Sequence, residues 1–381
     1  MNCIKSIFPI VAAALVMAAS CCRGSRTAEV FDTVYYAPSH AAGFEIIGCR
    51  DSLSRVIRVM SPWQDADSTA FDLFIARGGE NPPEGFSGQV IRGQAERIVA
   101  MSSSYVAMLD LVGETGRICG VSGMDFISNT SVLGRRGSIV DVGNEADADF
   151  EKLVSVRPDL VLLYGITASS PMEGRLRSLG IPYMYVGEYL ESDPLGKSEW
   201  IVAIAEVAGV VQEGVCVFDG ICRRYEALKE EVREKAAGRP KVMLNVPYGD
   251  IWYMASAISP VATMIADAGG EYLYRDNLTN KSIPIDMEKA FALASEADFW
   301  FDTGRISSME ELLSSYPRFS GVRCVVEGNV FNNDRRMSPG GGNDFWESGQ
   351  VRPDLVLEDL AGILHPELRD GEGLHYYRRL D

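Results

Sequence analysis

Two glutamates at matching positions of a repeated segment are the first candidates for a functional role in this chain. Residues 149–163 and 286–301 both begin with Asp-x-Glu-Lys and end in an apolar run, so Glu151 and Glu288 occupy equivalent places. Each copy predicts an N-capping Asp, a short amphipathic helix, a turn and a buried strand. A carboxylate near the start of a helix can bind a guanidinium group of a partner bidentately. The alternative is that it only stabilises its own helix, by interacting with the positive end of the helix macrodipole.

Aromatic side chains that follow or end predicted strands form a second group of candidates. Ligands of open α/β sheets bind at the carboxyl ends of the strands, and flat rings with a polar tip suit large chelates. The alternative is ordinary core packing, which we expect for rings inside strands such as Tyr183, Phe299 and Trp300. The candidate ligand-binding aromatics are Tyr105, Phe126, Tyr164, Tyr185, Tyr189, Tyr248, Trp252 and Trp346.

Two adjacent arginines, Arg335 and Arg336, precede the glycine-rich stretch 339–343. Their guanidinium groups could neutralise an anionic ferric chelate or haem propionates, and a solvated surface loop is the alternative with equal support. The glycines lack the strand–GxxxxGK–helix context of a phosphate loop, so they are weak evidence by themselves.

Composition and motifs argue against several classes of function. Lysine and arginine number 36 against 53 aspartates and glutamates, and the resulting net charge of −17 argues against nucleic-acid binding. The histidines, His40, His365 and His375, lie outside the loops expected to form a cleft, so we expect no metal held by protein ligands and no cofactor. No G-x-S-x-G or H-E-x-x-H motif is present, so an enzyme is not expected, although a carboxylate-only hydrolase stays open.

The elements that would position these residues change character along the chain. Residues 44–75 alternate apolar and polar side chains and predict added antiparallel strands. From residue 97 short helices alternate with apolar strands, the last of them at 323–326, which predicts mostly parallel sheets flanked by helices. The longest helical stretch, 212–237, would span about 39 Å.

The repeat and this long helix together predict an α/β fold of two similar lobes with a ligand cleft between them. The expected domains are an N-terminal lobe at 44–211, a linking helix at 212–238 and a C-terminal lobe at 239–381.

The first residues of the chain indicate export. The apolar run 7–19 is too short to span a membrane and ends in small residues before Cys21. This pattern is typical of a bacterial lipoprotein signal, so we expect a signal peptide at 1–20, acylation of the Cys21 thiol and a tether at 21–43. An ordinary secretory signal and an uncleaved anchor are the alternatives.

Several segments match a known family in order and with two-lobe spacing. They are Arg97-Ile-Val-Ala-Met-Ser, Leu153-Val-Ser-Val-Arg-Pro-Asp-Leu-Val, Leu179-Gly-Ile-Pro-Tyr, Arg352-Pro-Asp-Leu-Val-Leu-Glu-Asp-Leu-Ala and Ile363-Leu-His-Pro-Glu. From residue 97 to residue 368 the chain resembles the class III periplasmic solute-binding proteins, which deliver iron–siderophores, haem or cobalamin to ABC importers. Residues 22–95 are less well covered by this resemblance.

The resemblance implies roles for some of these residues. In that family one rigid helix joins the lobes, which fits 212–237, so the cleft closes only slightly. A glutamate on each lobe docks into arginine pockets of the membrane permease, and Glu151 and Glu288 match those positions. Tyr164 and Tyr185 fall where the family commonly places aromatic residues of the cleft.

We therefore expect a lipid-anchored substrate-binding protein on the periplasmic side of a membrane in the cell envelope. Its partners would be an ABC permease dimer with its ATPase, the membrane through the lipid anchor, and a small-molecule metal chelate bound without chemical change. A ferric siderophore or related iron complex is the first choice of ligand, followed by cobalamin and then haem. The alternatives from other classes are the carboxylate-dependent hydrolase and a surface lipoprotein without a transport role.

Overall fold

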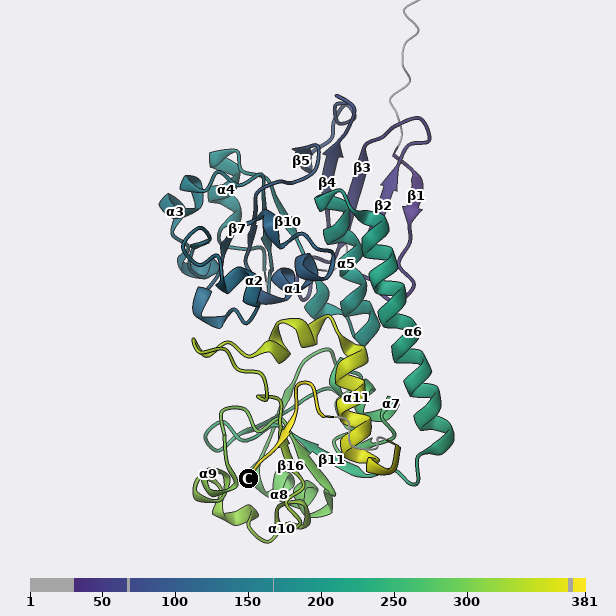
Figure 1. Cartoon of the computed structure of the whole chain (residues 1–381), viewed down its shortest axis with the longest axis vertical. Helices are drawn as coiled ribbons and strands as arrows, with labels where there is room; N and C mark the ends of the chain where they lie inside the picture. Colours follow the sequence, from purple (N-terminus) through teal and green to yellow (C-terminus); the bar gives the residue numbers. More distant parts are fainter. Residues whose placement is uncertain (1–30, 67–68, 167, 369–372) are drawn as a thin grey trace, which may run out of the picture.

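The computed structural model of the chain describes residues 31–66, 69–166, 168–368 and 373–381, which fold into two α/β lobes with an additional sheet (Figure 1). The predicted signal peptide and the lipidation site Cys21 lie outside these residues, as does the first part of the predicted tether. Within the described residues no helix has both the length and the apolar character needed to cross a membrane.

The N-terminal lobe is built on a parallel five-stranded sheet with the order β10-β9-β6-β7-β8. Its strands are β6 (Ile98–Ala100), β7 (Ile118–Val121), β8 (Val140–Asp141), β9 (Leu160–Leu163) and β10 (Tyr183–Tyr185). Its helices are α1 (Ser103–Leu111), α2 (Thr130–Leu133), α3 (Phe150–Ser155), α4 (Glu173–Leu179) and α5 (Pro194–Ala208).

The C-terminal lobe has a sheet with the order β13-β11-β15-β16-β17, in which only β17 is antiparallel to its neighbour. Its strands are β11 (Lys241–Leu244), β13 (Glu271–Tyr272), β15 (Phe299–Phe301), β16 (Val330–Asn332) and β17 (Arg378–Arg379), with β12 (Trp252–Met254) and β14 (Ile283–Ile285) as a separate pair. Its helices are α7 (Pro260–Asp267), α8 (Met287–Glu296), α9 (Met309–Ser315), α10 (Arg323–Val326) and α11 (Pro353–Leu364).

One predicted strand is wrong, because residues 323–326 form the helical turn α10. Cys324 and Val325 are buried on this turn, and a short apolar run is ambiguous between a strand and a buried helical turn. Gly328 then adopts a left-handed conformation with φ of 69°, and the strand β16 begins at Val330.

The repeated segment forms the same structure in both lobes, as predicted. Asp149 accepts a hydrogen bond from the backbone N–H of Lys152 at 3.0 Å and caps α3. Asp286 accepts from the backbone N–H of Lys289 at 2.7 Å and caps α8. Each helix leads into a strand with neighbours on both sides in its sheet, β9 in the first lobe and β15 in the second.

A second aspartate of each repeat clamps two neighbouring strands at their start. In the first lobe the Asp159 N–H donates to the Arg97 carbonyl at 2.8 Å, and the Asp159 carboxylate accepts from the Arg97 N–H at 3.0 Å. In the second lobe Asp298 and Lys241 form the same two bonds, at 2.9 and 2.8 Å. The clamp therefore fixes which residues of the two strands lie opposite each other in both sheets.

The long helix α6 (Val211–Lys235) runs beside both lobes (Figure 1), which confirms the predicted helical connection. Its 25 residues correspond to about 38 Å. Its buried residues recur every three or four positions, as expected for one packed helix face. They are Gly214, Phe218, Ile221, Tyr225, Leu228 and Val232.

Both α5 and α11 pack on this face of α6. At Gly214 an added Cβ would lie 2.4 Å from the Ala205 side chain, so glycine allows the close approach of α6 and α5. An ion pair of 2.7 Å between Arg224 and the buried Asp354 joins α6 to α11. Buried apolar residues of the two lobes and of these helices form one continuous core.

The predicted antiparallel addition is a five-stranded sheet, here called the accessory sheet, beside α5. Its strands are β1 (Thr33–Tyr36), β2 (Phe44–Gly48), β3 (Arg55–Met60), β4 (Ala70–Ala76) and β5 (Gln89–Arg92), of which β1 to β4 are antiparallel and β5 is parallel to β4. The buried carboxylate of Glu199 on α5 accepts bonds of 2.7–2.8 Å from the Tyr36 hydroxyl and from the backbone N–H groups of residues 39–41. This carboxylate therefore fastens the accessory sheet to the N-terminal lobe.

Replacing Asp298 by alanine should lower the free energy of unfolding by about 1–2 kcal/mol, because the Lys241 N–H loses its acceptor and Arg323 loses one of its two ion-pair partners. Chemical denaturation measures this change. Asp298→Asn, which keeps an acceptor oxygen, should cost less, and Glu84→Ala on an exposed loop should cost nothing measurable. Equal stability of the Asp298→Ala variant and the wild type would contradict the clamp.

Candidate ligand-binding site

A cavity of about 480 Å³ lies between the two lobes, within the range of about 300–1,000 Å³ that is typical of small-molecule sites. The N-terminal side consists of the loops after β9 and β10, and the C-terminal side consists of the loop before α7 and the loop before β14. We call it the interlobe cavity. Its lining residues are Gln64, Ile166, Tyr189, Leu190, Glu191, Ser192, Ser256, Ile258, Ser259, Pro260, Thr279, Asn280, Lys281 and Ser282.

The walls of the interlobe cavity combine exposed apolar groups with hydroxyl and amide groups. Ile166 is 59% exposed, Ile258 is 47% exposed and Tyr189 is 37% exposed, which is high for large apolar side chains. Removing such surface from water is favourable at about 25 cal/mol per Å². A ligand with a large apolar surface would therefore gain binding energy here, while the polar groups would fix its orientation.

Tyr189 is the predicted site residue that lines this cavity. Its hydroxyl group donates to the carbonyl of Gly165, which fixes the ring on the cavity wall. Burial raises the pKa of Tyr189 to about 12, so the phenol is neutral at physiological pH. The ring can offer an apolar face without adding charge to the site.

The accessory sheet takes part in this site. Its β3–β4 loop supplies Gln64 to the cavity wall, and the neighbouring Asp65 forms an ion pair of 2.8 Å with Lys281 of the C-terminal lobe. Sequence reasoning missed Gln64, Ile258 and Lys281. These residues lie on loops without periodicity, and nothing in their spacing indicates that the chain brings them together.

A second contact between the lobes involves the segment that follows β16. The Ser103 hydroxyl donates to the Trp346 carbonyl at 3.2 Å, and the Ser128 N–H donates to the Glu347 carboxylate at 2.7 Å. An added Cβ at Gly342 would lie 2.4 Å from the Phe126 carbonyl oxygen, so the glycine-rich stretch packs closely against the N-terminal lobe.

Glu347 is a buried carboxyl group at this second contact. Its burial raises its pKa to about 7, although the Ser128 and Asn129 N–H groups act in the opposite direction. The carboxylates of Asp344 and Asp110 raise it further. The protonation of Glu347 therefore changes near neutral pH at a place where the two lobes touch.

Five predicted aromatics are at least partly open to solvent on loops that follow strands. Tyr189 lines the interlobe cavity, Phe126 is 68% exposed, and Trp346 is 58% exposed at the second contact. Tyr248, on the loop after β11, is 83% exposed. Tyr164 is half-buried, and its N–H donates to Glu145 at 2.7 Å.

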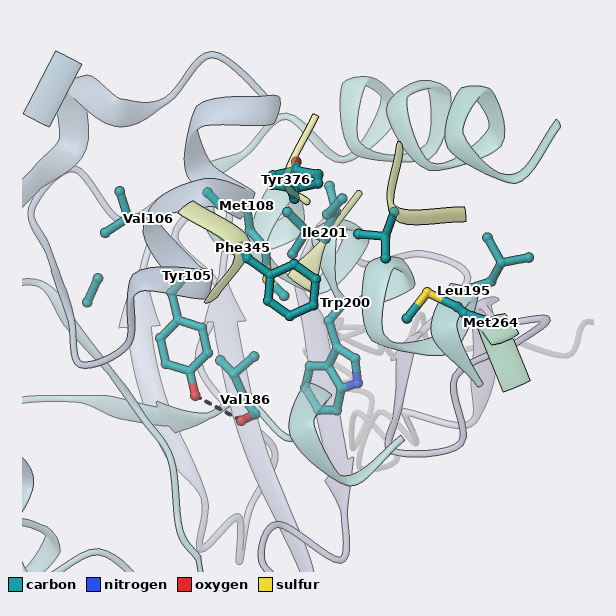
Figure 2. Close-up of a cluster of buried hydrophobic side chains, with 14 of the residues drawn as sticks. Tyr105, Val106, Met108, Val186, Leu195, Trp200, Ile201, Met264, Phe345 and Tyr376 are labelled. Atoms are coloured by element: carbon teal, nitrogen blue, oxygen red, sulfur yellow. Dashed lines mark hydrogen bonds between the residues drawn. The ribbon is translucent and has the colours of Figure 1, made fainter. Parts of the chain in front are cut away.

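Three predicted ligand-binding aromatics are core residues instead. Tyr105 is fully buried on α1, and its hydroxyl donates to the Val186 carbonyl at 3.0 Å (Figure 2). Tyr185 and Trp252 lie inside β10 and β12, where both are buried. Tyr185 and Trp252 therefore belong with the rings inside strands, for which we expect core packing. Tyr105 is a core residue for a different reason, because it lies on the buried face of a helix.

The indole N–H of Trp252 and the hydroxyl group of Tyr185 also have hydrogen-bond partners within the protein. The Trp252 indole N–H donates to the Leu244 carbonyl at 2.9 Å. The Tyr185 hydroxyl donates to the Glu173 carboxylate at 3.0 Å and accepts from the Ser170 N–H at 2.8 Å. Neither ring can contact a ligand in the interlobe cavity without rearrangement of the core.

The two predicted arginines differ in what they can do. The Arg336 guanidinium pairs with Asp344 at 3.0 Å and lies 5.5 Å from the centre of the Tyr376 ring, so its charge is already compensated. Arg335 is exposed, and in the described part of the chain its guanidinium has no hydrogen-bond or ion-pair partner. Arg335 is the better candidate for binding an anionic ligand.

The predicted docking residues and the histidines lie away from the interlobe cavity. Glu151 and Glu288 are exposed in the first turns of α3 and α8. His40 pairs with Asp193 at 2.8 Å, and His375 lies 3.2 Å from Glu358. Among the described residues no group of three or more His, Cys, Asp or Glu side chains is placed to hold a metal ion.

The carboxyl groups with raised pKa values do not line the interlobe cavity. Asp302 directly follows β15, and desolvation of its carboxyl group within the fold raises its pKa to about 6. It accepts bonds from the Tyr377 hydroxyl at 3.0 Å and the Asn333 amide at 2.9 Å. Asp302 and Glu347 therefore serve as hydrogen-bond acceptors within the fold, and their positions do not favour a hydrolase.

Comparison with protein families gives a match to the periplasmic binding protein family over residues 98–336, which is more than half of the chain. The chain is a periplasmic binding protein. The two lobes and their long helix place it in class III of this family, which confirms the resemblance seen in the sequence.

Solved structures agree with this fold. A periplasmic haem-binding protein from Pseudomonas aeruginosa has a TM-score of 0.58 at 17% identity, with 75% of this chain and 98% of that chain covered. A periplasmic vitamin B12-binding protein from Vibrio cholerae has a TM-score of 0.50 at 13% identity, with 73% and 99% covered. These likenesses confirm the α/β class and the two-lobe architecture.

The chain is also similar to an uncharacterized lipoprotein of Methanocaldococcus jannaschii. The two are 27% identical over 300 residues, which is 76% of this chain and 70% of the relative. A second lipoprotein of that organism is 24% identical over 336 residues, with 83% and 81% covered.

Glu347→Gln should change the pH dependence of stability. Because the pKa of Glu347 is about 7 in the folded protein and 4.5 in a model compound, its protonation stabilises the fold fully below about pH 4.5, and this contribution is lost as the pH rises through 7. The stability of the wild type relative to the variant should fall by about 1–3 kcal/mol between pH 4.5 and 8.

Urea denaturation at several pH values measures this difference, and Glu84→Gln on an exposed loop provides the matched control. The control should follow the wild type at every pH. Parallel stability profiles of Glu347→Gln and the wild type would show that this carboxyl group does not titrate as described.

Proposed function

We propose that this periplasmic binding protein is the lipid-anchored substrate-binding component of an ABC importer and binds a metal chelate between its lobes. The interlobe cavity is the observation that carries the proposal, because it combines exposed apolar side chains from both lobes with fixed polar groups. Binding leaves the ligand chemically unchanged, since no arrangement for catalysis lines the cavity among the described residues.

The ligand class is supported by the family and by the composition of the cavity. Structural neighbours include proteins described as binding haem and vitamin B12 and one described as a possible iron-binding protein, and each of these ligands is a metal or a metal complex. Tyr189 offers a ring face for stacking, and Phe126 and Trp346 extend exposed aromatic surface along the second interlobe contact. Arg335, which is exposed and has no ion-pair partner among the described residues, can compensate negative charge of a ligand.

A chelate whose metal is already fully coordinated fits these residues better than haem does. Haem iron takes a His, Cys, Met or Tyr side chain as its axial ligand. Among the described residues that line the interlobe cavity, the only such side chain is Tyr189, and its hydroxyl is bonded to Gly165. We therefore place a ferric siderophore first and cobalamin second, with haem third.

The partners follow from the same proposal. Glu151 and Glu288 are exposed at equivalent positions of the two lobes, where each can dock into an arginine pocket of the permease dimer that works with its ATPase. Lipid on Cys21 would hold the protein at the periplasmic side of a membrane, as the similarity to lipoproteins supports.

Tyr189→Ala should weaken binding of the chelate about ten- to a hundredfold, since a stacked ring contributes about 1–3 kcal/mol. Titrations with ferric siderophores, cyanocobalamin and haemin, followed by absorbance and tryptophan fluorescence, measure the affinity and identify the ligand. Tyr35→Ala is the matched control, because Tyr35 has similar exposure on the accessory sheet. Failure of every chelate to bind the wild type would refute the proposed ligand class.

Glu151→Ala combined with Glu288→Ala should abolish uptake of the chelate in cells and leave its affinity for the purified protein within about twofold, because both carboxylates lie away from the cavity. Glu213→Ala combined with Glu310→Ala is the control, with the same charge change in the first turns of α6 and α9. Normal uptake by the Glu151 and Glu288 double variant would exclude the docking role.

A further inference from the structure

A second cavity, of about 430 Å³, lies outside the interlobe site between the accessory sheet and the N-terminal lobe. We call it the sheet–lobe cavity. The accessory sheet supplies Trp63, Phe71 and Phe86 to its walls, and the N-terminal lobe supplies Glu173 and Arg177. The three aromatic residues precede residue 98, so they lie outside the segment that matches the family.

The aromatic walls are held in fixed positions by a buried floor. Tyr183 and Tyr185 are buried beneath the cavity. The Phe71 ring lies 5.4 Å from the centre of each of these rings, and Trp63 lies 5.6 Å from Tyr185 at 65°. Trp63, Phe71 and Phe86 themselves are half-buried, so part of each ring is open to the cavity.

Gly88 shapes the wall formed by Phe86. An added Cβ at this position would lie 2.2 Å from the Asp72 carbonyl oxygen and 2.6 Å from the Phe86 ring. Only glycine therefore lets the Phe86 ring lie against the chain here. The position of this ring, and with it one side of the cavity, depends on that close approach.

The charged groups of the sheet–lobe cavity compensate one another. Glu173 accepts from the Arg177 guanidinium at 2.6 Å and from the Tyr183 hydroxyl at 2.8 Å. The Asp72 carboxylate accepts from two guanidinium nitrogens of Arg58, Nε at 3.0 Å and Nη2 at 3.2 Å. A charged ligand gains most from an unpaired group of opposite charge beside the rings, and the carboxylates of Glu173 and Asp72 and the guanidinium of Arg177 are already paired. The cavity therefore favours a ligand without net charge.

Uncharged polar side chains complete the lining. They are the amide of Gln89 and the hydroxyls of Ser87 and Thr69. None of these three groups has a hydrogen-bond partner among the residues that the structure describes. An amide or hydroxyl group can donate and accept, so the three suit a ligand with several hydroxyl groups.

We propose that the sheet–lobe cavity binds a neutral carbohydrate of one or two sugar rings. The apolar face of a pyranose stacks on an aromatic ring, while its hydroxyls bond to amide, hydroxyl and charge-paired groups at the edge. The volume lies near the lower end of the range for small-molecule sites, which favours a mono- or disaccharide over a longer chain. This site is separate from the interlobe cavity and does not depend on the proposed transport function.

The test uses the full chain with a panel of neutral sugars, namely glucose, galactose, mannose, lactose, maltose and cellobiose, and with choline and benzoate as charged probes. Saturation-transfer NMR and calorimetry measure binding. At least one neutral sugar should bind, and Phe86→Ala and Gln89→Ala should each weaken that binding about tenfold or more. Gln89→Ala keeps the test valid if loss of the Phe86 ring prevents folding.

Gln64→Ala is the matched control, because Gln64 lines the interlobe cavity and not the sheet–lobe cavity. It should leave sugar affinity unchanged. The proposal is overturned if no sugar of the panel binds, if only choline or benzoate binds, or if Gln89→Ala has no effect on a bound sugar. Loss of sugar binding in Gln64→Ala alone would overturn it as well, because the sugar would then occupy the interlobe cavity.

Discussion

The packing of α5 and α11 against one face of α6 is the constraint on which the rest of this structure depends. The contact of Gly214 with Ala205 and the ion pair of Arg224 with Asp354 hold the three helices together. Because the buried cores of the two lobes are continuous through this junction, a large hinge motion would open a close-packed interior. The interlobe cavity therefore has to exist before the ligand arrives, and recognition depends on the loops that line it.

The fold could be predicted from the sequence because its main signals are local. The N-capping aspartates Asp149 and Asp286, the apolar strands and the long helical stretch each depend on residues that are neighbours in the chain. The sequence of α10 predicts a strand, and the structure differs, because four residues are too few to show a helical period.

The site was less predictable, since it depends on contacts between distant segments. Tyr105, Tyr185 and Trp252 follow or end apolar runs as Tyr189 does, yet burial makes the first three core residues and leaves Tyr189 at the cavity. Lys281 meets Asp65 across 216 positions of the chain. No local pattern indicates such a pairing, so the accessory sheet's part in the site could be seen only in three dimensions.

The strand clamps formed by Asp159 and Asp298 have a consequence for how such a protein changes over evolutionary time. Each clamp lies wholly within one lobe and joins the strand of the repeat to the first strand of that lobe's sheet along the chain. Strand alignment in one half is therefore independent of the other half. Insertions or substitutions in one lobe can therefore leave the strand register of the other lobe unchanged.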